Sequence, residues 1–260
     1  WFDSRPPRPA GTAASGRQVL LWPDTFTDYF SPEVGQAAVE VLEHAGFEVL
    51  LPPDGLCCGL TWFTTGQLDT ARRVLSRTLD AVDPYLSRGI PMVGLEPGCT
   101  SLFRSDAGEL LSGDPRAHRA ARSVLTFAEL LDRHAPDADL GRLERAAVTQ
   151  THCHQHATLG KAADDRVMSR IGLDNERLDS GCCGLAGNFG FEKEHYGISV
   201  KIAENVLLPA LRAAAPDTAV VADGFSCRTQ ISQLSSRRPV HLAELLRDSI
   251  RASAEAGPDA

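Results

Sequence analysis

The sequence predicts an α/β protein built from two tandem, similar halves, each a small parallel sheet flanked by helices. Two observations carry this prediction. The string CCGL occurs twice, at 57–60 and 182–185, and the next cysteine follows 41 positions after Cys58 and 44 positions after Cys183, which indicates an internal duplication. Short apolar runs also alternate with amphipathic stretches along each half, which is the pattern of parallel strands joined by right-handed helical crossovers.

Length and composition limit the classes of protein that fit. The 260 residues, 43% hydrophobic and 23% charged, are enough to bury a sizeable core without metals or disulfides. The formal net charge of -8 gives no general reason to bind nucleic acid, and no apolar run is long enough to span a membrane. The first seventeen residues contain no apolar core of the secretory type, and residue 1 is Trp, so we expect a segment of a longer polypeptide.

The first half shows its elements in a regular order. Each predicted strand is a short apolar run closed by a turn residue, as at Pro23. Each predicted helix carries apolar residues at three- and four-residue steps, and the first of them starts at Ser31-Pro32 and ends at Gly46. The predicted strands cover 19–22, 47–51 and 90–95, and the predicted helices cover 32–45, 68–82 and 127–134.

The second half repeats this order. Predicted strands cover 146–151, 176–178 and 219–222, and predicted helices cover a stretch that ends near Ile171, then 193–214 and 242–249. Pro209 is expected to kink or break the second of these helices. The late helices of the two halves have related sequences, FAELLDRH and LAELLRDS. We therefore expect a linker over 1–17, a first repeat over 18–136, a second repeat over 140–250 and a flexible tail over 251–260.

The cysteines are the candidate functional residues. Seven of them, an odd number in a chain that can fold by its core, fit a reducing compartment and predict a cytoplasmic protein. They follow predicted strands, where doubly wound folds bind ligands, and iron–sulfur clusters and structural zinc both take thiolates from separate loops. The glycine after each vicinal pair permits the sharp turn that brings both thiols to one metal group. The candidate ligands are Cys153, Cys182, Cys183 and Cys227 in the second half and Cys57, Cys58 and Cys99 in the first.

Other interpretations of these residues stay open. A buried cysteine is often a small structural hydrophobe, and a vicinal pair can act as a redox dithiol, although two CCGL copies with matched downstream thiols favour metal. His152, His154 and His156 flank Cys153 and would share one face of an extended segment; each is a candidate ligand or a hydrogen-bond donor to sulfur. The glycines at 187–190 lack GxGxxG spacing, so we assign no catalytic or cofactor-binding residue outside the thiols.

The doubled CCG loops, together with THCH at 151–154 and ADGFSC at 222–227, resemble the cysteine-rich CCG domain family. Members include the cysteine-rich component of heterodisulfide reductase, the iron–sulfur subunits of glycolate oxidase and anaerobic glycerol-3-phosphate dehydrogenase, and the lactate-utilisation iron–sulfur protein. The resemblance covers roughly 18–250 of this chain. It is strongest to the C-terminal region of FAD-linked, iron–sulfur D-2-hydroxyacid dehydrogenases of the D-lactate and D-2-hydroxyglutarate type.

The resemblance implies that the chain is part of an FAD-linked iron–sulfur oxidoreductase and is not catalytic by itself. FAD in a separate domain or partner would oxidise the hydroxyacid, and an iron–sulfur cluster, [4Fe-4S] by this resemblance, would pass the electrons to a quinone or other acceptor. The implied partners are the FAD-binding and ferredoxin-like domains of the same polypeptide or complex. The implied location is the cytoplasm, free or peripheral to the inner face of the membrane.

The family motif has an upstream Cys, the CCG pair and a closing CxxC, and this sequence departs from it. Gly224 and Glu96 stand where the first Cys of CxxC would be, and Thr25 aligns with Cys153. We therefore expect one four-thiolate cluster in the second half in place of a five-thiolate non-cubane cluster, with the first half degenerate, zinc-binding or lending a ligand. The alternatives are a structural zinc module that docks the flavoprotein onto a partner, and a redox enzyme that uses the vicinal dithiol.

Overall fold

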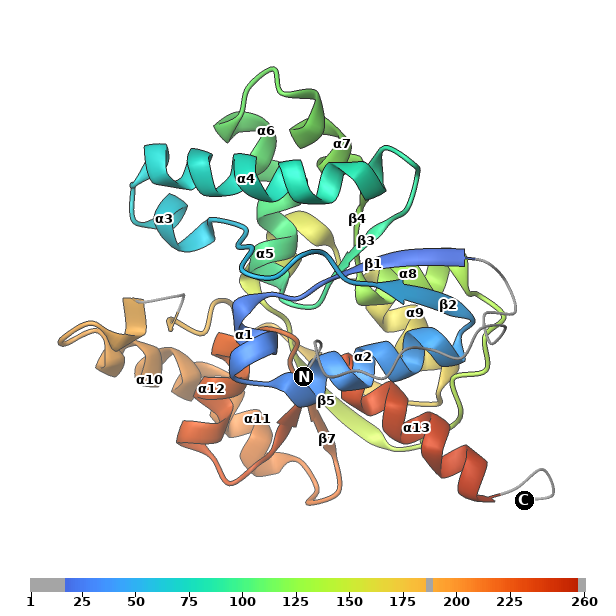
Figure 1. Ribbon diagram of the computed structural model, residues 1–260. Coiled ribbons are helices and arrows are strands. Elements are labelled where there is room, and N and C mark those ends of the chain that lie inside the picture. The colour runs from blue at the N-terminus through green and yellow to red at the C-terminus, as the bar shows by residue number, and fades with distance from the viewer. Residues whose placement is uncertain (1–16, 186–188, 257–260) are drawn as a thin grey trace. The chain divides into compact units, whose positions relative to one another are not determined.

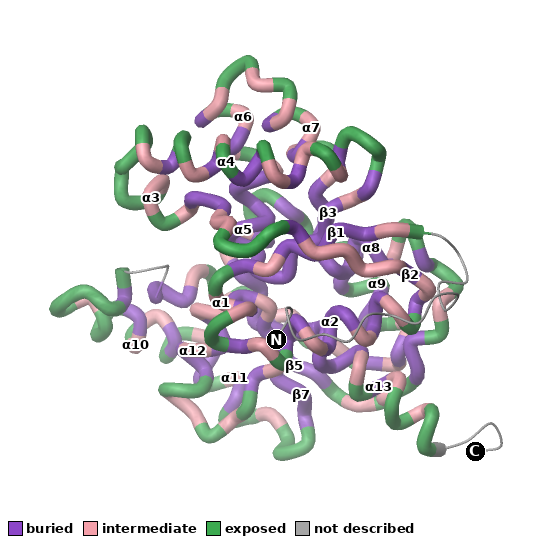
Figure 2. Tube along the Cα trace, viewed as in Figure 1, coloured by how far each residue is buried: buried purple, intermediate pink, exposed green. Residues whose placement is uncertain are grey.

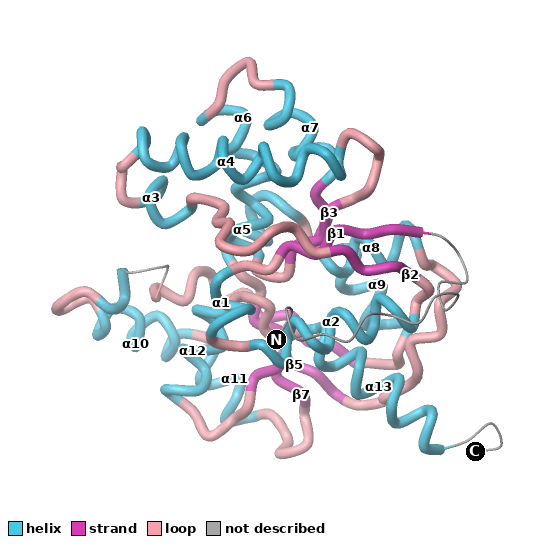
Figure 3. Tube along the Cα trace, in the orientation of Figure 1, coloured by secondary structure: helices cyan, strands magenta, loops and turns pink. Residues whose placement is uncertain are grey.

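The computed structural model of the chain describes residues 17–185 and 189–256. The chain divides into two compact units, Trp1–Ala138 and Asp139–Ala260. Each unit is a parallel sheet with helices packed against it (Figure 1; Figure 3). The predicted fold class, an α/β protein of two tandem similar halves, is confirmed.

The first unit is built on a parallel sheet with the strand order β2-β1-β3-β4. Its strands are β1 (Arg17–Trp22), β2 (Phe47–Leu50), β3 (Met92–Gly94) and β4 (Val124–Thr126). Its helical segments are α1 (Thr25–Tyr29), α2 (Pro32–His44), α3 (Leu60–Thr64), α4 (Leu68–Leu86), α5 (Pro97–Ser101), the π-helical η2 (Leu102–Asp106), α6 (Ala107–Leu110), α7 (Pro115–Ser123) and α8 (Phe127–His134).

Alternation along the strands gives the first sheet two buried faces. Leu20 and Trp22 pack in one cluster with Leu75 and Leu79 of α4, so α4 covers that face. Val19 and its alternating neighbours point to the opposite face, where α2 contacts β2 and α8 contacts β3. Strand β3 is buried along its whole length (Figure 2). Near-continuous apolar strands are what a parallel sheet covered on both faces requires.

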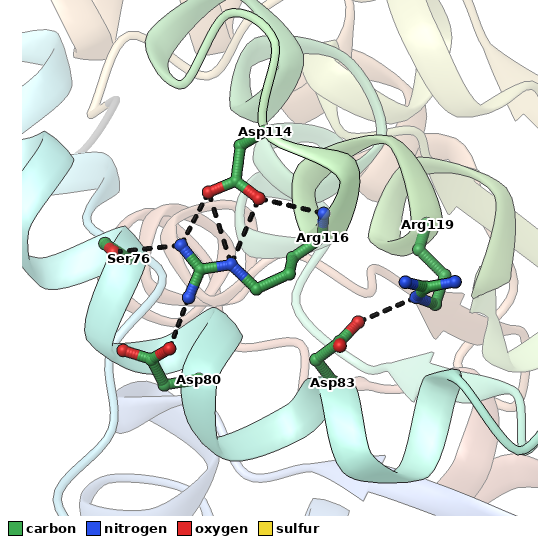
Figure 4. A network of polar contacts seen from close by, with 6 residues as sticks. All are labelled: Ser76, Asp80, Asp83, Asp114, Arg116 and Arg119. Atoms are coloured by element: carbon green, nitrogen blue, oxygen red, sulfur yellow. Dashed lines mark hydrogen bonds and ion pairs between the residues drawn. The ribbon is translucent and has the colours of Figure 1, made fainter.

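Charged side chains join α4 to α7 outside this core. Arg116 of α7 reaches Asp80 and Ser76 of α4 and also Asp114 at the start of its own helix (Figure 4). Nearby, Arg119 Nε donates to Asp83 Oδ1 at 2.7 Å. Asp114 also accepts the backbone N–H of Arg116 at 2.9 Å, which caps α7 at its N-terminus. The network fixes the two helices in register along their exposed faces.

The second unit repeats the arrangement with the strand order β6-β5-β7-β8, again fully parallel. Its strands are β5 (Ala146–Gln150), β6 (Asp174–Leu178), β7 (Ala219–Val221) and β8 (Pro239–Val240). Its helical segments are the π-helical η3 (Gln155–Leu159), α9 (Ala162–Arg170), the short 3-10 turn η4 (Phe189–Phe191), α10 (Tyr196–Asn205), α11 (Leu207–Ala213), α12 (Phe225–Leu234) and α13 (Leu242–Ala256). Val148 and Val220 pack with Leu207 of α11 and Ile231 of α12 in the core of this unit.

The late helices show the duplication at the level of single hydrogen bonds. Thr126 caps α8 in a reciprocal box: its side chain accepts the Glu129 N–H at 3.1 Å, and its own N–H donates to Glu129 at 3.0 Å. In the second unit the N–H of His241 donates to Glu244 at 2.9 Å. His241 thus precedes α13 and caps it, whereas the sequence pattern places this residue inside a helix.

Several expectations need correction. The sequence does not predict β4 or β8, which are three and two residues long and too short to show a period. The helix expected over 193–214 breaks at Val206, where φ is -136°. Pro209 instead lies in the first turn of α11, where a missing N–H costs no helical hydrogen bond.

The two expected chain ends also differ from the structure. Helix α13 continues to Ala256, so residues 251–256 of the expected flexible tail are helical, and 257–260 lie outside the described residues. Arg17, assigned to the linker, is the first residue of β1; the rest of the linker, 1–16, lies outside the described residues. Ser31 precedes α2 as expected, but its side chain makes no capping hydrogen bond, so Pro32 at the first helical position is the start signal.

We expect Glu129→Gln to destabilise the first unit. Burial disfavours the Glu129 carboxylate, but hydrogen bonds from Arg104 and from the Thr126 N–H outweigh it and lower its pKa. A carboxyl whose folded pKa is lowered stabilises the fold above its ordinary pKa, and this contribution disappears as the pH falls through the folded pKa. The variant should therefore lose about 1 to 2 kcal/mol of unfolding free energy at neutral pH and less in acid.

Urea denaturation at pH 7 and at about pH 4 measures both effects. Glu109→Gln is the matched control, because Glu109 is an exposed carboxylate in the same unit. Equal stability of Glu129→Gln and the wild type at pH 7 would contradict the role given to this carboxylate.

Candidate functional site

The cysteines lie at one edge of each sheet. Because all strands of a sheet are parallel, their carboxyl ends open at the same edge. In the second unit Cys153 follows β5, the pair Cys182-Cys183 follows β6, and Cys227 follows β7. In the first unit Cys57-Cys58 follow β2, Cys99 follows β3, and Thr25 stands after β1 where Cys153 stands after β5. The structure thus gives the two repeats the same placement of thiols that the sequence alignment predicts.

The two CCG loops have the same local geometry. Gly59 and Gly184 adopt left-handed φ values of +93° and +71°, which only glycine takes without strain. Each glycine then donates its N–H to the first cysteine of its pair, at 3.5 Å to Cys57 Sγ and 3.4 Å to Cys182 Sγ. The expected sharp turn after each vicinal pair is therefore present in both repeats.

The carbonyl of Cys183 is held from two sides in the second repeat. Ser199 Oγ of α10 donates to it at 2.8 Å, and Gln230 Nε2 of α12 donates to it at 2.5 Å. In the first repeat Thr78 Oγ1 of α4 donates to the carbonyl of Cys57 at 2.7 Å. Buried hydroxyls and an amide thus fix the backbone of each loop, so the thiols are positioned by hydrogen bonds as well as by the turn.

The downstream cysteines begin helices. Cys99 is the third residue of α5, and Cys227 is the third residue of α12. The residue before each helix is Glu96 in the first repeat and Gly224 in the second. The N-terminus of a helix carries partial positive charge and free N–H groups, so it favours a thiolate there.

The thiols of the first repeat lie in a carboxylate-rich environment. Cys58 Sγ and Cys99 Sγ are 3.0 Å apart, and both residues are buried. Contact with Cys58 favours the Cys99 thiolate, but burial and the nearby carboxylates of Asp24 and Glu96 outweigh it and raise the pKa of Cys99. The hydrogen bond to Cys58, followed by burial, raises the pKa of Cys57. These surroundings disfavour a second negative charge.

The thiols of the second repeat are arranged around one thiolate. Hydrogen bonds from Cys153 and Cys183, against a smaller effect of burial, lower the pKa of Cys182 to about 2. The same bond raises the pKa of Cys153, because its proton is held between the two sulfurs, and burial acts in the same direction. Cys227 lies close enough to act electrostatically on Cys153. The second repeat therefore brings its predicted thiols to one place and favours ionisation of one of them.

The donor set fits a cluster better than a single ion. Across the described residues, no group of three or more His, Cys, Asp or Glu side chains is arranged to hold one metal ion. A single zinc needs four ligands about 2.3 Å from one point, whereas a cluster takes one thiolate at each of several iron atoms. Four cysteines from three loops, with sulfurs that need not meet at one point, match the second requirement.

Three residues around the thiols have roles that the sequence does not reveal. Nothing in the sequence marks Asp24 and Glu96 as charges beside the thiols, and His152 is there one of three equivalent candidate ligands. The segment that follows β5 is not extended: Cys153 begins a helical stretch, so the three histidines do not share one face. Burial lowers the pKa of His152 to about 4, so this imidazole is neutral at physiological pH.

The comparisons with known proteins agree with this site. Residues 24–104 match the cysteine-rich domain family CCG. The chain is 29% identical over 237 residues to one of the subunits of the anaerobic glycerol-3-phosphate dehydrogenase of Escherichia coli (strain K12), which covers 90% of this chain and 59% of the relative. It is 27% identical over 240 residues to the D-2-hydroxyglutarate dehydrogenase of Pantoea ananatis, which covers 90% of this chain and 23% of the relative.

A third relative is almost fully covered. Lactate utilization protein A of Exiguobacterium sp. is 26% identical over 247 residues, which is 90% of this chain and 98% of the relative. The resemblance to the cysteine-rich CCG domain is confirmed, as is the similarity to parts of oxidoreductases. The chain spans about three fifths of the first relative and under a quarter of the second. Among the helices of the described residues, none is both long and apolar enough to cross a bilayer.

We expect Cys182 to be alkylated at a rate that does not rise with pH. Its lowered pKa keeps it a thiolate from about pH 6 to 9, whereas the raised pKa of Cys57 keeps that residue protonated. The two cysteines occupy matching positions and are both partly exposed, so Cys57 is an internal control. Iodoacetamide labelling of reduced, metal-free protein, followed by mass spectrometry, measures both rates.

Removing the donor provides a second check. In Cys153→Ala the thiolate of Cys182 loses its main hydrogen bond, so its labelling should become pH-dependent. A labelling rate for Cys182 that rises with pH in the unsubstituted protein, in parallel with Cys57, would contradict the charge distribution described for the second repeat.

Proposed function

We propose that the chain is the iron–sulfur electron-transfer part of an FAD-dependent D-2-hydroxyacid dehydrogenase, with one [4Fe-4S] cluster in the second repeat. The observation that carries the proposal is the convergence of three cysteine-bearing loops at the carboxyl edge of the second sheet. The proposed ligands are Cys153, Cys182, Cys183 and Cys227. The cluster would supply one-electron redox chemistry, and the chain's own residues set its surroundings.

Burial at this edge suits electron transfer. Cys183 and Cys227 are buried, at 4% and 1% exposure, whereas Cys153 and Cys182 are partly exposed. A cluster held by these residues would be shielded on its inner side and close to the surface on the other. Solvent exposure and hydrogen bonds to sulfur both set the potential of such a cluster, and the Gly184 N–H already donates to Cys182 Sγ.

The partners follow from the relatives. Two relatives carry the name of a dehydrogenase or of part of one, and the D-2-hydroxyglutarate dehydrogenase is more than four times as long as its matching region. We infer that FAD-binding and ferredoxin-like domains of the same polypeptide or complex deliver electrons to this chain. A quinone or another acceptor receives them, in the cytoplasm or at the inner face of the membrane.

The first repeat is proposed not to hold a second cluster. It offers three thiols, and the carboxylates of Asp24 and Glu96 raise the pKa of Cys99. Negative charge beside the thiols opposes an assembly that needs every thiol as a thiolate. A zinc-based docking role for this repeat is the result that metal analysis would reveal instead.

One observation favours a second candidate function. In the second repeat a thiolate, Cys182, accepts a hydrogen bond from the thiol of Cys153, which is the pairing that thiol–disulfide exchange uses. A vicinal-dithiol redox enzyme would exploit this pair without metal. Metal content of a cysteine variant separates the two functions.

We expect about four iron and four sulfide per chain after anaerobic purification. Cys182→Ser should lose them, and with them the EPR signal that appears on reduction with dithionite. Cys57→Ser, the matched change in the first repeat, should retain both. Zinc without iron would support the docking module instead, and loss of disulfide-reducing activity at unchanged metal content would support the dithiol enzyme.

We also expect the isolated chain not to oxidise D-2-hydroxyacids. The described residues carry their thiols at the sheet edges, and no flavin site is predicted from the sequence. Turnover of D-lactate or D-2-hydroxyglutarate, followed with a dye acceptor, should require added flavoprotein. Turnover by the pure chain would contradict the division of labour proposed between this chain and its partner.

A further inference from the structure

The imidazole of His152 fills the space beside Gly224. A Cβ atom built on Gly224 would lie 2.2 Å from Cδ2 of His152, 3.0 Å from Cγ and 3.3 Å from Nε2. These separations are far below van der Waals contact, so no side chain fits at position 224 while the ring stays where it is. His152 is only 7% exposed, so the ring has little room to move away.

Backbone conformation does not explain this glycine. Gly224 has φ -74° and ψ 131°, an extended conformation that any residue adopts. Gly184, by contrast, has φ +71° and is required by its turn. Position 224 therefore lacks a side chain because the space is occupied.

Neither partner of this contact can retreat easily. Nδ1 of His152 accepts the backbone N–H of His154 at 3.2 Å, which fixes the ring at the start of the helical stretch. Arg228 donates to the carbonyl oxygens of Ala222 at 3.0 Å and Asp223 at 2.6 Å, which fixes the loop that carries Gly224. The ring and the loop are thus held independently.

The first repeat provides an internal comparison. Asp24 stands after β1 where His152 stands after β5, and its carboxylate accepts the N–H of Phe26 at 3.0 Å. Both side chains therefore cap the residue two positions ahead. Opposite Asp24 the first repeat has Glu96 before its downstream helix, and opposite His152 the second repeat has Gly224. The smaller capping side chain accompanies a full side chain, and the larger ring accompanies none.

The capping bond also decides how the ring can act. Because Nδ1 accepts an N–H, the neutral imidazole carries its hydrogen on Nε2. A nitrogen that keeps its hydrogen cannot coordinate a metal, but it can donate to sulfur. His152 is neutral at physiological pH as described above, so it adds no charge to the thiol group.

We propose that His152 and Gly224 form a coupled pair that limits the second repeat to four thiolates. The imidazole takes the space of a fifth side chain, three residues before Cys227, and offers its Nε2–H to sulfur. His152 is thus a positioning residue that tunes the site. The statement about sulfur rests on the proposed function, whereas the steric coupling does not.

The steric coupling is tested on the complete chain without metal. We expect Gly224→Ala to lower the Tm of the reduced, metal-free protein by about 5 °C or more, because the new methyl group meets the ring. In a His152→Ala background the same change should lower the Tm by less than about 2 °C. Gly197→Ala is the matched control, since nothing lies within 4 Å of its added Cβ.

The result that overturns the coupling is equal destabilisation by Gly224→Ala in both backgrounds. This readout does not depend on iron, so it remains decisive even if the chain takes up no cluster. Failure to reconstitute iron in the unsubstituted chain would contradict the proposed function alone, and the two failures are therefore distinguishable.

The role toward sulfur is tested on the reconstituted chain. We expect His152→Ala to keep its iron and to show a lower reduction potential, because a donor to sulfur is lost. His152→Asn should restore the potential, since its oxygen can cap the His154 N–H and its amide can donate. Loss of iron in both His152 variants to the extent seen in Cys182→Ser would show ligation by His152 and overturn the donor role.

The coupled exchange makes the last comparison. The double variant His152→Ala with Gly224→Cys should fold, since the ring is gone, and should place a fifth thiol beside the cluster. Its EPR spectrum should then differ from that of His152→Ala. An unchanged spectrum would overturn the statement that position 224 faces the cluster.

Discussion

Parallel strand pairing is the constraint on which the site depends. When β5 pairs in parallel with both β6 and β7, the loops after all three strands emerge at one edge of the sheet. Residues separated by more than seventy positions, such as Cys153 and Cys227, then belong to the same edge. An antiparallel pairing would send alternate loops to opposite edges and separate the thiols. The chemistry of this chain thus follows from the direction of its strands.

The duplication gives the protein two copies of the same scaffold with different electrostatics. Both repeats keep the strand order, the left-handed glycine and the N–H donated to the first cysteine of the pair. They differ at the positions around the thiols: Asp24 and Glu96 surround one set, and His152 and Gly224 the other. Carboxylates oppose thiolate formation, whereas a neutral imidazole does not. Divergence after duplication has therefore changed the sites without changing the fold.

Hydrogen bonds to backbone hold the cysteine loops more directly than apolar packing does. The carbonyl of Cys183 receives donors from two helices, Ser199 and Gln230, and Thr78 does the same for Cys57 in the first repeat. Buried donors of this kind are costly to leave without a partner. They tie the loop geometry to the core, so the distances among thiols are set by elements far away in sequence.

The sequence by itself determined the fold class, the duplication and the seven candidate cysteines, because apolar periodicity and repeated motifs are local properties that a chain displays without folding. It could not reveal β4, β8 or the break at Val206, since short strands carry too few residues to show a period. Only the tertiary structure decided which side chains meet: the ring of His152 against Gly224 joins residues 72 positions apart. Such steric exclusion exists only after parallel pairing has brought the two loops to one edge.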